Sequence, residues 1–181
     1  MENIFLFLIG IIGLLGYLVS QLYNELARLN SRVDRNFSGI DTQLSRRHAV
    51  IKNLLGSVGR EQKSVMDQFE ALTKLVEKAD LQRSNPQAYF DTEKQISRMW
   101  NQLLNLPQIQ NILGFRDLNK QIAELEEELA ASRRNYNASV ERFNTYLMSF
   151  PTGFIAQLFF KQFQQRPYFE ATTEERQNID V

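Results

Sequence analysis

IFLFLIGIIGLLGYLV, residues 4–19, contains no charged side chain, and this stretch dominates the fold prediction for the whole chain. With its neighbours it provides about 20 mostly apolar positions, enough for a helix to cross the roughly 30 Å hydrocarbon core of a bilayer. A signal peptide is disfavoured, because the start, Met1-Glu2-Asn3, has no Lys or Arg and residues 18–23, LVSQLY, lack the spaced pair of small side chains of a cleavage site. We predict an uncleaved transmembrane anchor over residues 1–22.

The charges beside the anchor predict its orientation. Arg28, Arg32 and Arg35 follow it, and no Lys or Arg precedes it. Positively charged flanks stay on the cytoplasmic side, so we expect a short N-terminus outside and the body of the protein in the cytoplasm.

The composition excludes several classes of protein. Lys plus Arg and Asp plus Glu both number 21, so there is no basic field for nucleic acid, and we expect no nucleic-acid partner. The absence of Cys excludes disulfides and thiolate sites. Only four Pro and eight Gly occur in 181 residues, which favours long helices and leaves one ordinary domain beyond the anchor.

Beyond the anchor, apolar residues recur at steps of three and four, the spacing of an amphipathic helix. The first run extends from Leu22 to Val58, and no Pro or polar Gly cluster separates it from the anchor, so both should form one helix. Asn85-Pro86 has the pattern of an N-cap followed by the first helical residue. The predicted helices cover about residues 22–58, 61–80, 86–106, 115–150 and, as a short element, 153–165, and residues 170–181 form a loose polar tail.

Short connections make neighbouring helices antiparallel. We therefore predict an all-α protein whose N-terminal transmembrane helix runs into a long-helix antiparallel four-helix bundle, a coiled-coil-like domain, over residues 23–169. A stalk would pair about residues 22–37 with 136–150 and return the aromatic-rich segment 154–169 to the membrane-proximal end. That segment either closes the base of the bundle, which we favour because Lys161 and Arg166 give only a weak cationic face, or lies at the lipid interface.

A search for chemistry finds no grouped nucleophile, base or metal ligands, so we expect no catalytic activity, no metal and no cofactor. The chain has one His, His48, for which we predict a position on the surface or at the edge of the helix seam. The acidic run Glu124 to Glu128 predicts a solvated helix face. An aromatic residue followed by an amide occurs three times, as Tyr23-Asn24, Tyr136-Asn137 and Phe143-Asn144. These amides either hydrogen-bond across helices and fix their register, or are exposed beside core aromatics.

Two blocks of residues resemble the LemA family. The first follows the anchor and includes residues 23–29 (YNELARL), Arg32-Val33, Ile40-Asp41, Gln43-Leu44 and Arg46-Arg47-His48. The second includes Phe115-Arg-Asp-Leu118, Glu126, residues 133–137 (RRNYN), Phe143-Asn144, Phe150-Pro151 and Tyr168-Phe169. Lys52 stands where the family has Pro, and Leu106-Pro107 replaces a Tyr-Pro segment, so the chain resembles a divergent member.

The resemblance implies a bacterial single-pass inner-membrane protein with long antiparallel helices and no established enzymatic activity. We expect a membrane-tethered scaffold whose partners are the lipid bilayer and either another protein or a second copy of the chain. A ligand-sensing bundle with a pocket among Phe69, Trp100, Tyr136 and Phe143 is the alternative, and an enzyme is a weaker rival. The candidate structural or interaction residues are Tyr23, Asn24, Arg46, Arg47, Tyr136, Asn137, Phe143, Asn144, Phe150 and Pro151.

Overall fold

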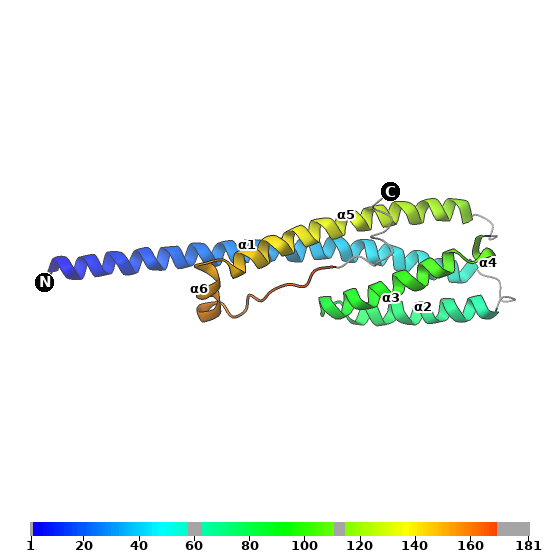
Figure 1. The fold of residues 1–181 in the computed structure, drawn as a ribbon, viewed down its shortest axis with the longest axis horizontal. Coiled ribbons are helices and arrows are strands. Elements are labelled where there is room, and N and C mark those ends of the chain that lie inside the picture. Colours follow the sequence, from blue (N-terminus) through cyan, green and yellow to red (C-terminus); the bar gives the residue numbers. More distant parts are fainter. Residues whose placement is uncertain (1, 58–62, 111–114, 170–181) are drawn as a thin grey trace. The chain divides into compact units, whose positions relative to one another are not determined.

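The computed structural model describes residues 2–57, 63–110 and 115–169. Within these ranges the protein is helical and contains no strand, which confirms the all-α prediction. In chain order the helices are α1 (Glu2–Ser57), α2 (Lys63–Leu81), α3 (Pro86–Leu104), α4 (Pro107–Gln110), α5 (Phe115–Met148) and α6 (Thr152–Phe159), as Figure 1 shows.

Some helix ends differ from the sequence-based bounds. The anchor and the first predicted helix form the single helix α1. Asn85 is the N-cap of α3 and accepts a hydrogen bond from the Ala88 backbone N–H, with Pro86 in the first turn, as predicted. The short helix predicted to reach residue 165 ends at Phe159, because Phe160 has φ −124° and ψ 46°. The predicted polar tail, residues 170–181, and Val58 and Gly59 at the predicted first helix end lie outside the described residues.

The contacts divide the chain into two compact units. Unit 1 contains the described residues up to Ser38 and Asn135–Arg166. Unit 2 contains the described residues of Gly39–Arg134 and those that follow Arg166. The predicted boundary between anchor and body, at residues 22 and 23, falls inside α1 and remains a prediction about the membrane.

In unit 1, α1 and α5 pack side by side and run antiparallel. The Asn36 side-chain amide donates to the Asn135 carbonyl at 3.1 Å, and the ring centroids of Phe37 and Tyr136 are 6.2 Å apart. Nearer the N-terminus of α1, one groove is lined by Glu25 and Arg28 together with late α5 residues. The buried positions keep the three-and-four spacing of a helix seam: Leu26, Leu29 and Val33 on α1, and Tyr136, Val140, Phe143 and Leu147 on α5.

The N-terminal segment of α1 is apolar and uncovered. Among the described residues, α1 is the one helix long and apolar enough to cross a membrane, judged by length and composition. Its large apolar side chains between Ile4 and Leu18 are 39% to 68% exposed, so this is not the core helix of a globular domain. A contiguous apolar surface of this kind requires a lipid bilayer or another protein to cover it.

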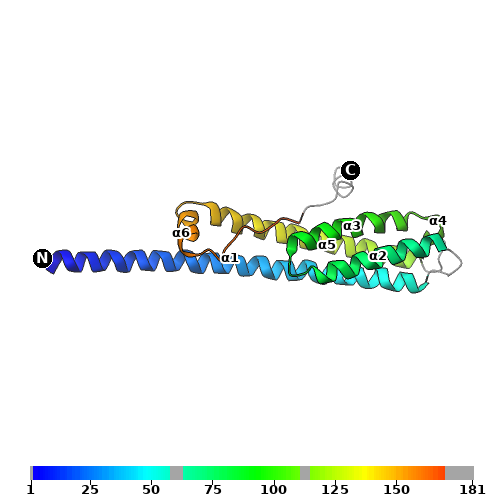
Figure 2. The same ribbon diagram turned by 90° about the horizontal axis from the view of Figure 1, so that it is seen from below.

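After α5, the chain of unit 1 turns through the cis peptide Phe150–Pro151 into α6. Figures 1 and 2 both show α6 lying across the direction of α1. The chain then leaves the helix and runs back along unit 1 as far as Arg166.

In unit 2, α2 and α3 pack together along their length (Figures 1 and 2). The apolar face of α2 is buried, and on α3 Trp100 is buried whereas its neighbour Met99 is half-buried. Phe169 is also buried here, with its ring centroid 4.3 Å from that of Phe90 and 5.0 Å from the Arg133 guanidinium. The buried apolar residues of the helices are Ile40, Leu44, Ile51, Val65, Phe69, Leu72, Val76, Ala79, Tyr89, Phe90, Ile96, Trp100, Leu103, Ile109, Ile122 and Leu129.

Candidate functional site

The densest polar cluster of unit 2 is a buried ion network centred on Glu93 of α3. Both carboxylate oxygens of Glu93 are engaged by α1: Arg47 Nη2 donates to Oε2 at 2.6 Å, and His48 Nε2 lies 2.9 Å from Oε1. An ionised carboxylate only accepts hydrogen bonds, so His48 must carry its proton on Nε2. Arg47 also donates to the Ser97 hydroxyl at 2.8 Å. The network therefore connects α1 to two successive turns of α3.

Further charges surround this pair. Glu126 of α5 lies 3.5 Å from Arg47 and 3.9 Å from Arg133, and Asp80 of α2 lies 3.6 Å from His48 Nδ1. Arg83, in the turn after α2, lies 2.7 Å from Asp80 and 3.0 Å from Asp41 of α1, so it links these two carboxylates. Positive and negative groups alternate, so each buried charge has an opposite neighbour, which is the condition for burying charges at all.

The environment of Glu93 determines its protonation. Burial alone would raise its pKa, but the hydrogen bonds and positive charges of His48 and Arg47 outweigh burial and hold the pKa below its ordinary value. Glu93 is therefore an ionised carboxylate at neutral pH. With its side chain fully buried and both oxygens occupied, it offers no open face to a substrate or ligand.

Tyr89, one turn before Glu93, donates its hydroxyl to Asp41 Oδ1 at 3.0 Å. Burial, together with the negative charges of Glu93 and Asp41, raises the pKa of Tyr89. The phenol stays neutral and acts as a hydrogen-bond donor between α3 and α1.

The two neighbouring arginines of α1 have different roles. Arg47 is buried, whereas Arg46 points outward and meets Glu128 of α5 at 3.1 Å, with the side chains 58% and 52% exposed. Exposed pairs of this type contribute little to stability. The buried position of His48 corrects its predicted surface or seam-edge position, because Glu93 compensates the cost of burying the imidazole. The acidic run of α5 is partly solvated as predicted, but Glu126 reaches inward to Arg47.

Unit 1 contains a second polar cluster, in which Asn144 of α5 holds the segment after α6. Its side-chain amide donates to the Arg166 carbonyl, and its Oδ1 accepts from the Arg166 backbone N–H, both at 2.9 Å. The Arg166 guanidinium donates to Asn30 and to Asp34 of α1, also at 2.9 Å. Asn144 thus acts across the unit, although its partner is the returning segment and not an amide on α1.

The remaining candidate residues lie along unit 1. Tyr136 and Phe143 are buried in the seam, and Asn137 is half-buried. Burial is the main cause that raises the pKa of Tyr136 to about 12. The Tyr23 ring makes an edge-to-face contact with Phe160 and a tilted contact with Phe163, with ring centroids 5.2 and 5.7 Å apart, while Asn24 is exposed. Pro151 is exposed, and Phe150 is 90% exposed.

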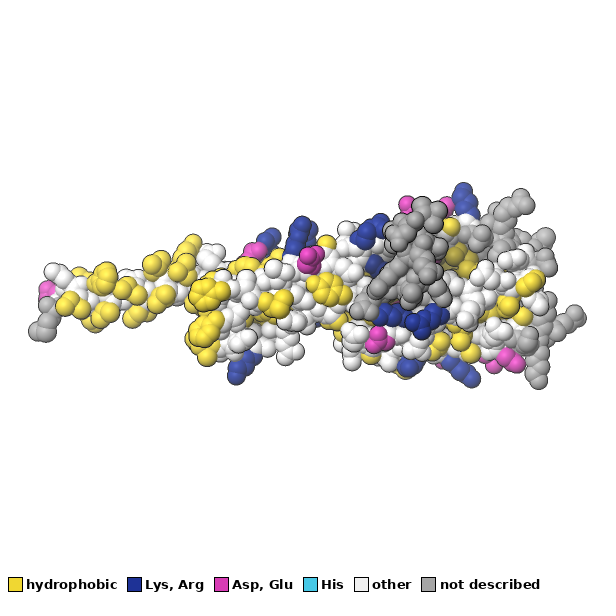
Figure 3. Space-filling view, viewed as in Figure 1, with side chains coloured by type: hydrophobic (Ala, Val, Ile, Leu, Met, Phe, Trp, Pro, Cys, Tyr) yellow, Lys and Arg dark blue, Asp and Glu magenta, His cyan; other side chains and the backbone are white. Residues whose placement is uncertain are grey.

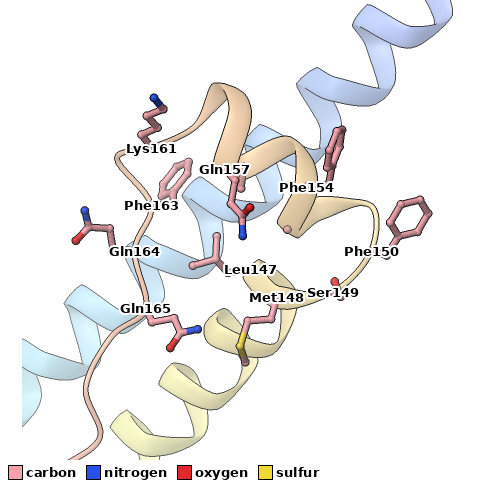
Figure 4. A pocket seen from close by; sticks show the side chains of 12 residues that line it. Leu147, Met148, Ser149, Phe150, Phe154, Gln157, Lys161, Phe163, Gln164 and Gln165 are labelled. Atoms are coloured by element: carbon pink, nitrogen blue, oxygen red, sulfur yellow. The ribbon is translucent and has the colours of Figure 1, made fainter.

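An open pocket of about 740 Å³ lies between the end of α5, α6 and the returning segment of unit 1 (Figure 4). Met148, Phe150 and Phe154 supply apolar walls, and Gln157, Lys161 and Gln164 supply polar ones. Among the described residues, no group of three or more His, Asp or Glu side chains is placed so that it could hold a metal ion.

Sequence reasoning missed Glu93, Ser97, Asp41 and the role of Arg166. The signal for Glu93 was its position: it lies three residues after Phe90 and three before Ile96, on the apolar face of α3. A charged residue at such a position indicates a buried partner of opposite charge.

The LemA family model matches residues 36–181. A comparison with curated proteins finds no match. The matched segment begins after the apolar part of α1, so the apolar helix segment and the family match are independent observations. Together they support a membrane-associated protein, and because the match covers most of the sequence, the chain belongs to the LemA family.

Proposed function

We propose that this protein is a membrane-tethered helical scaffold of the bacterial inner membrane, which binds other proteins or a second copy of itself through helix surfaces and not through catalysis. The observation that carries the proposal is the closed network at Glu93: the side chains best suited to acid–base chemistry bond to one another inside unit 2. What remains available to a partner is the outside of the helices.

The proposed fold of unit 2 is an antiparallel four-helix bundle. Its support is a set of contacts that link the helices in turn: α2 packs on α3, Arg47 of α1 pairs with Glu93 of α3, and Arg46 of α1 pairs with Glu128 of α5. Buried charges between helices favour one register over its neighbours, which suits a rigid scaffold.

Chemical crosslinking in membranes tests the scaffold. Leu81 at the end of α2 is 86% exposed, an unusual position for a large apolar side chain, and we would place a photocrosslinking residue there. The matched control is Glu77, which is exposed one turn earlier on the same helix. We expect a defined adduct from position 81 and little from position 77. If both positions, and further exposed positions of unit 2, yield only monomer, the scaffold proposal is wrong.

The proposed orientation places the body in the cytoplasm, because Arg28, Arg32 and Arg35 follow the apolar segment. The chain has no Cys, so single-Cys variants at Asn3 and Thr173 can be labelled in intact cells with a membrane-impermeant maleimide. Asn3→Cys should react before lysis and Thr173→Cys only after it. The reverse pattern would overturn the orientation without affecting the anchor itself.

The ligand-sensing alternative requires a pocket among four aromatic side chains. Phe69 and Trp100 belong to unit 2, and Tyr136 and Phe143 to unit 1. All four are almost completely buried, and none lines the 740 Å³ pocket beside α6, which favours a scaffold. A small molecule that changes the fluorescence of Trp100, the one Trp in the chain, would favour the sensor instead.

A further inference from the structure

The surface of α6 has an apolar face that nothing in unit 1 covers. Thr152 and Ala156, four residues apart, face inward and are buried. On the other side Phe154 and Leu158 are 67% and 58% exposed, and Phe159, the last residue of the helix, is 64% exposed. Phe150, just before the helix, is the most exposed large apolar side chain of the described residues. We call these four residues, Phe150, Phe154, Leu158 and Phe159, the α6 surface.

The contacts of Tyr23 fix the position of α6 along α1. The Tyr23 ring packs edge-to-face against Phe160, the residue directly after α6, and at a tilt against Phe163. Tyr23 lies four residues beyond Val19, the end of the uncharged stretch, which is about 6 Å along a helix at 1.5 Å per residue. A bilayer's head-group layer is about 5–7 Å thick on each side of the hydrocarbon core, so an anchor whose apolar part ends near Val19 would hold α6 at that level.

The direction of the α6 surface agrees with this position. α6 lies across α1 and therefore along the membrane plane when α1 crosses the bilayer (Figures 1 and 2). In Figure 4, Phe150 and Phe154 lie on the side nearer the N-terminal end of α1. Lys161, Gln164 and Gln165 lie on the opposite side. Figure 3 shows hydrophobic side chains gathered on α6 and again along the N-terminal part of α1.

We propose that the α6 surface inserts into the head-group layer of the bilayer that holds the anchor, so that the protein meets lipid through a spanning helix and an interfacial helix. Aromatic side chains favour this layer, and an amphipathic helix lies in it with its apolar face buried. The second contact would limit the tilt of α1 and hold unit 1 against the membrane. The inference rests on the proposed membrane anchor.

Quenching of fluorescence by spin-labelled lipid at single labelled positions tests the proposed insertion of the α6 surface. The full chain is reconstituted in vesicles of phosphatidylethanolamine and phosphatidylglycerol. An environment-sensitive NBD fluorophore is attached to Leu158→Cys, and a lipid spin-labelled near the head group is the quencher. Leu15→Cys reports the anchor. Arg35→Cys, exposed on α1 about 24 Å beyond Val19, is the matched aqueous control within unit 1.

We expect the label at position 158 to lose most of its fluorescence to the lipid quencher and to resist aqueous iodide, and the label at position 35 to behave in the opposite way. The triple variant F150S/F154S/F159S should restore the fluorescence at 158 while the label at position 15 stays quenched, with circular dichroism confirming an unchanged helix content.

The possible failures are distinguishable. If the label at position 15 is not quenched, the anchor itself is wrong. If position 15 is quenched and position 158 is open to iodide, the interfacial helix is wrong and the anchor stands. Protection of position 158 from both quenchers would show that a protein or a second copy covers the α6 surface, which would also overturn the lipid proposal.

Discussion

Replacing Glu93 by Gln should destabilise unit 2 by about 3 kcal/mol. The substitution keeps the shape of the side chain but removes the negative charge that Arg47 and His48 share. The side-chain NH₂ group of Gln would also face a hydrogen-bond donor, either Arg47 or His48, where the carboxylate oxygen of Glu93 now accepts a hydrogen bond. Removing one member of a buried ion pair costs about 3–5 kcal/mol, and the lower end applies because Glu126, 3.5 Å from Arg47, still compensates part of the charge.

The matched control is Glu128→Gln. It makes the same chemical change in an Arg–Glu pair between α1 and α5, at 3.1 Å from Arg46 but more than half exposed. Removing an exposed pair of this type should cost less than about 1 kcal/mol. The two variants therefore separate the effect of burial from the effect of losing a carboxylate.

Urea unfolding of the full chain in detergent micelles measures both variants. Trp100 lies on α3 in the same unit as Glu93, so its fluorescence reports the unfolding of unit 2. With a slope of about 1–3 kcal/mol per molar urea, the midpoint of E93Q should fall by about 1–3 M. If E93Q shifts the midpoint no more than E128Q does, the network is not the stabilising element that we infer.

Three further predictions concern single residues. The pKa of Glu93 lies below its ordinary value of 4.5, so its stabilising charge is present above about pH 4.5 and is lost as the pH falls through the lowered pKa. The difference in unfolding free energy between wild type and E93Q should therefore shrink in acid, and a difference that stays constant with pH would contradict the ionised state of Glu93. Asn144→Ala removes both hydrogen bonds to the Arg166 backbone, and we expect hydrogen exchange at that amide to accelerate at least tenfold, while Asn144→Asp, which keeps the acceptor, should retain part of the protection. Tyr136 should ionise only near pH 12, so an ultraviolet titration of wild type minus Tyr136→Phe should show no phenolate signal at about pH 10.

Periodicity was a good guide where apolar side chains form the core. The seam positions of α1, α2 and α5 and the N-cap of α3 follow from spacing and local hydrogen bonding alone. Periodicity failed at Arg47, which interrupts the apolar pattern after Leu44 but occupies the next buried position of the same face. Its partner Glu93 lies 46 residues away, and a pattern within one helix carries no information about it.

The end of α6 shows the same limit. The helix predicted from the sequence reached residue 165 and therefore included Phe160 and Phe163. In the structure these rings pack on Tyr23, and the two hydrogen bonds from Asn144 hold the backbone of Arg166. Long-range contacts override helix propensity here, since the α-helical alternative would forgo both sets of interactions.

Several of the residues that carry the LemA resemblance are used inside the molecule. Arg47, His48 and Glu126 belong to the buried ion network of unit 2, and Tyr136, Phe143 and Asn144 form the seam and the backbone clamp of unit 1. Such residues preserve a fold, and they have little surface left with which to contact anything else. Contact with other molecules is left to exposed side chains that packing does not require, and Phe150 is one of them although it belongs to the resemblance. Within the part of the chain that the structure describes, the α6 surface groups four such apolar side chains at the end of that seam.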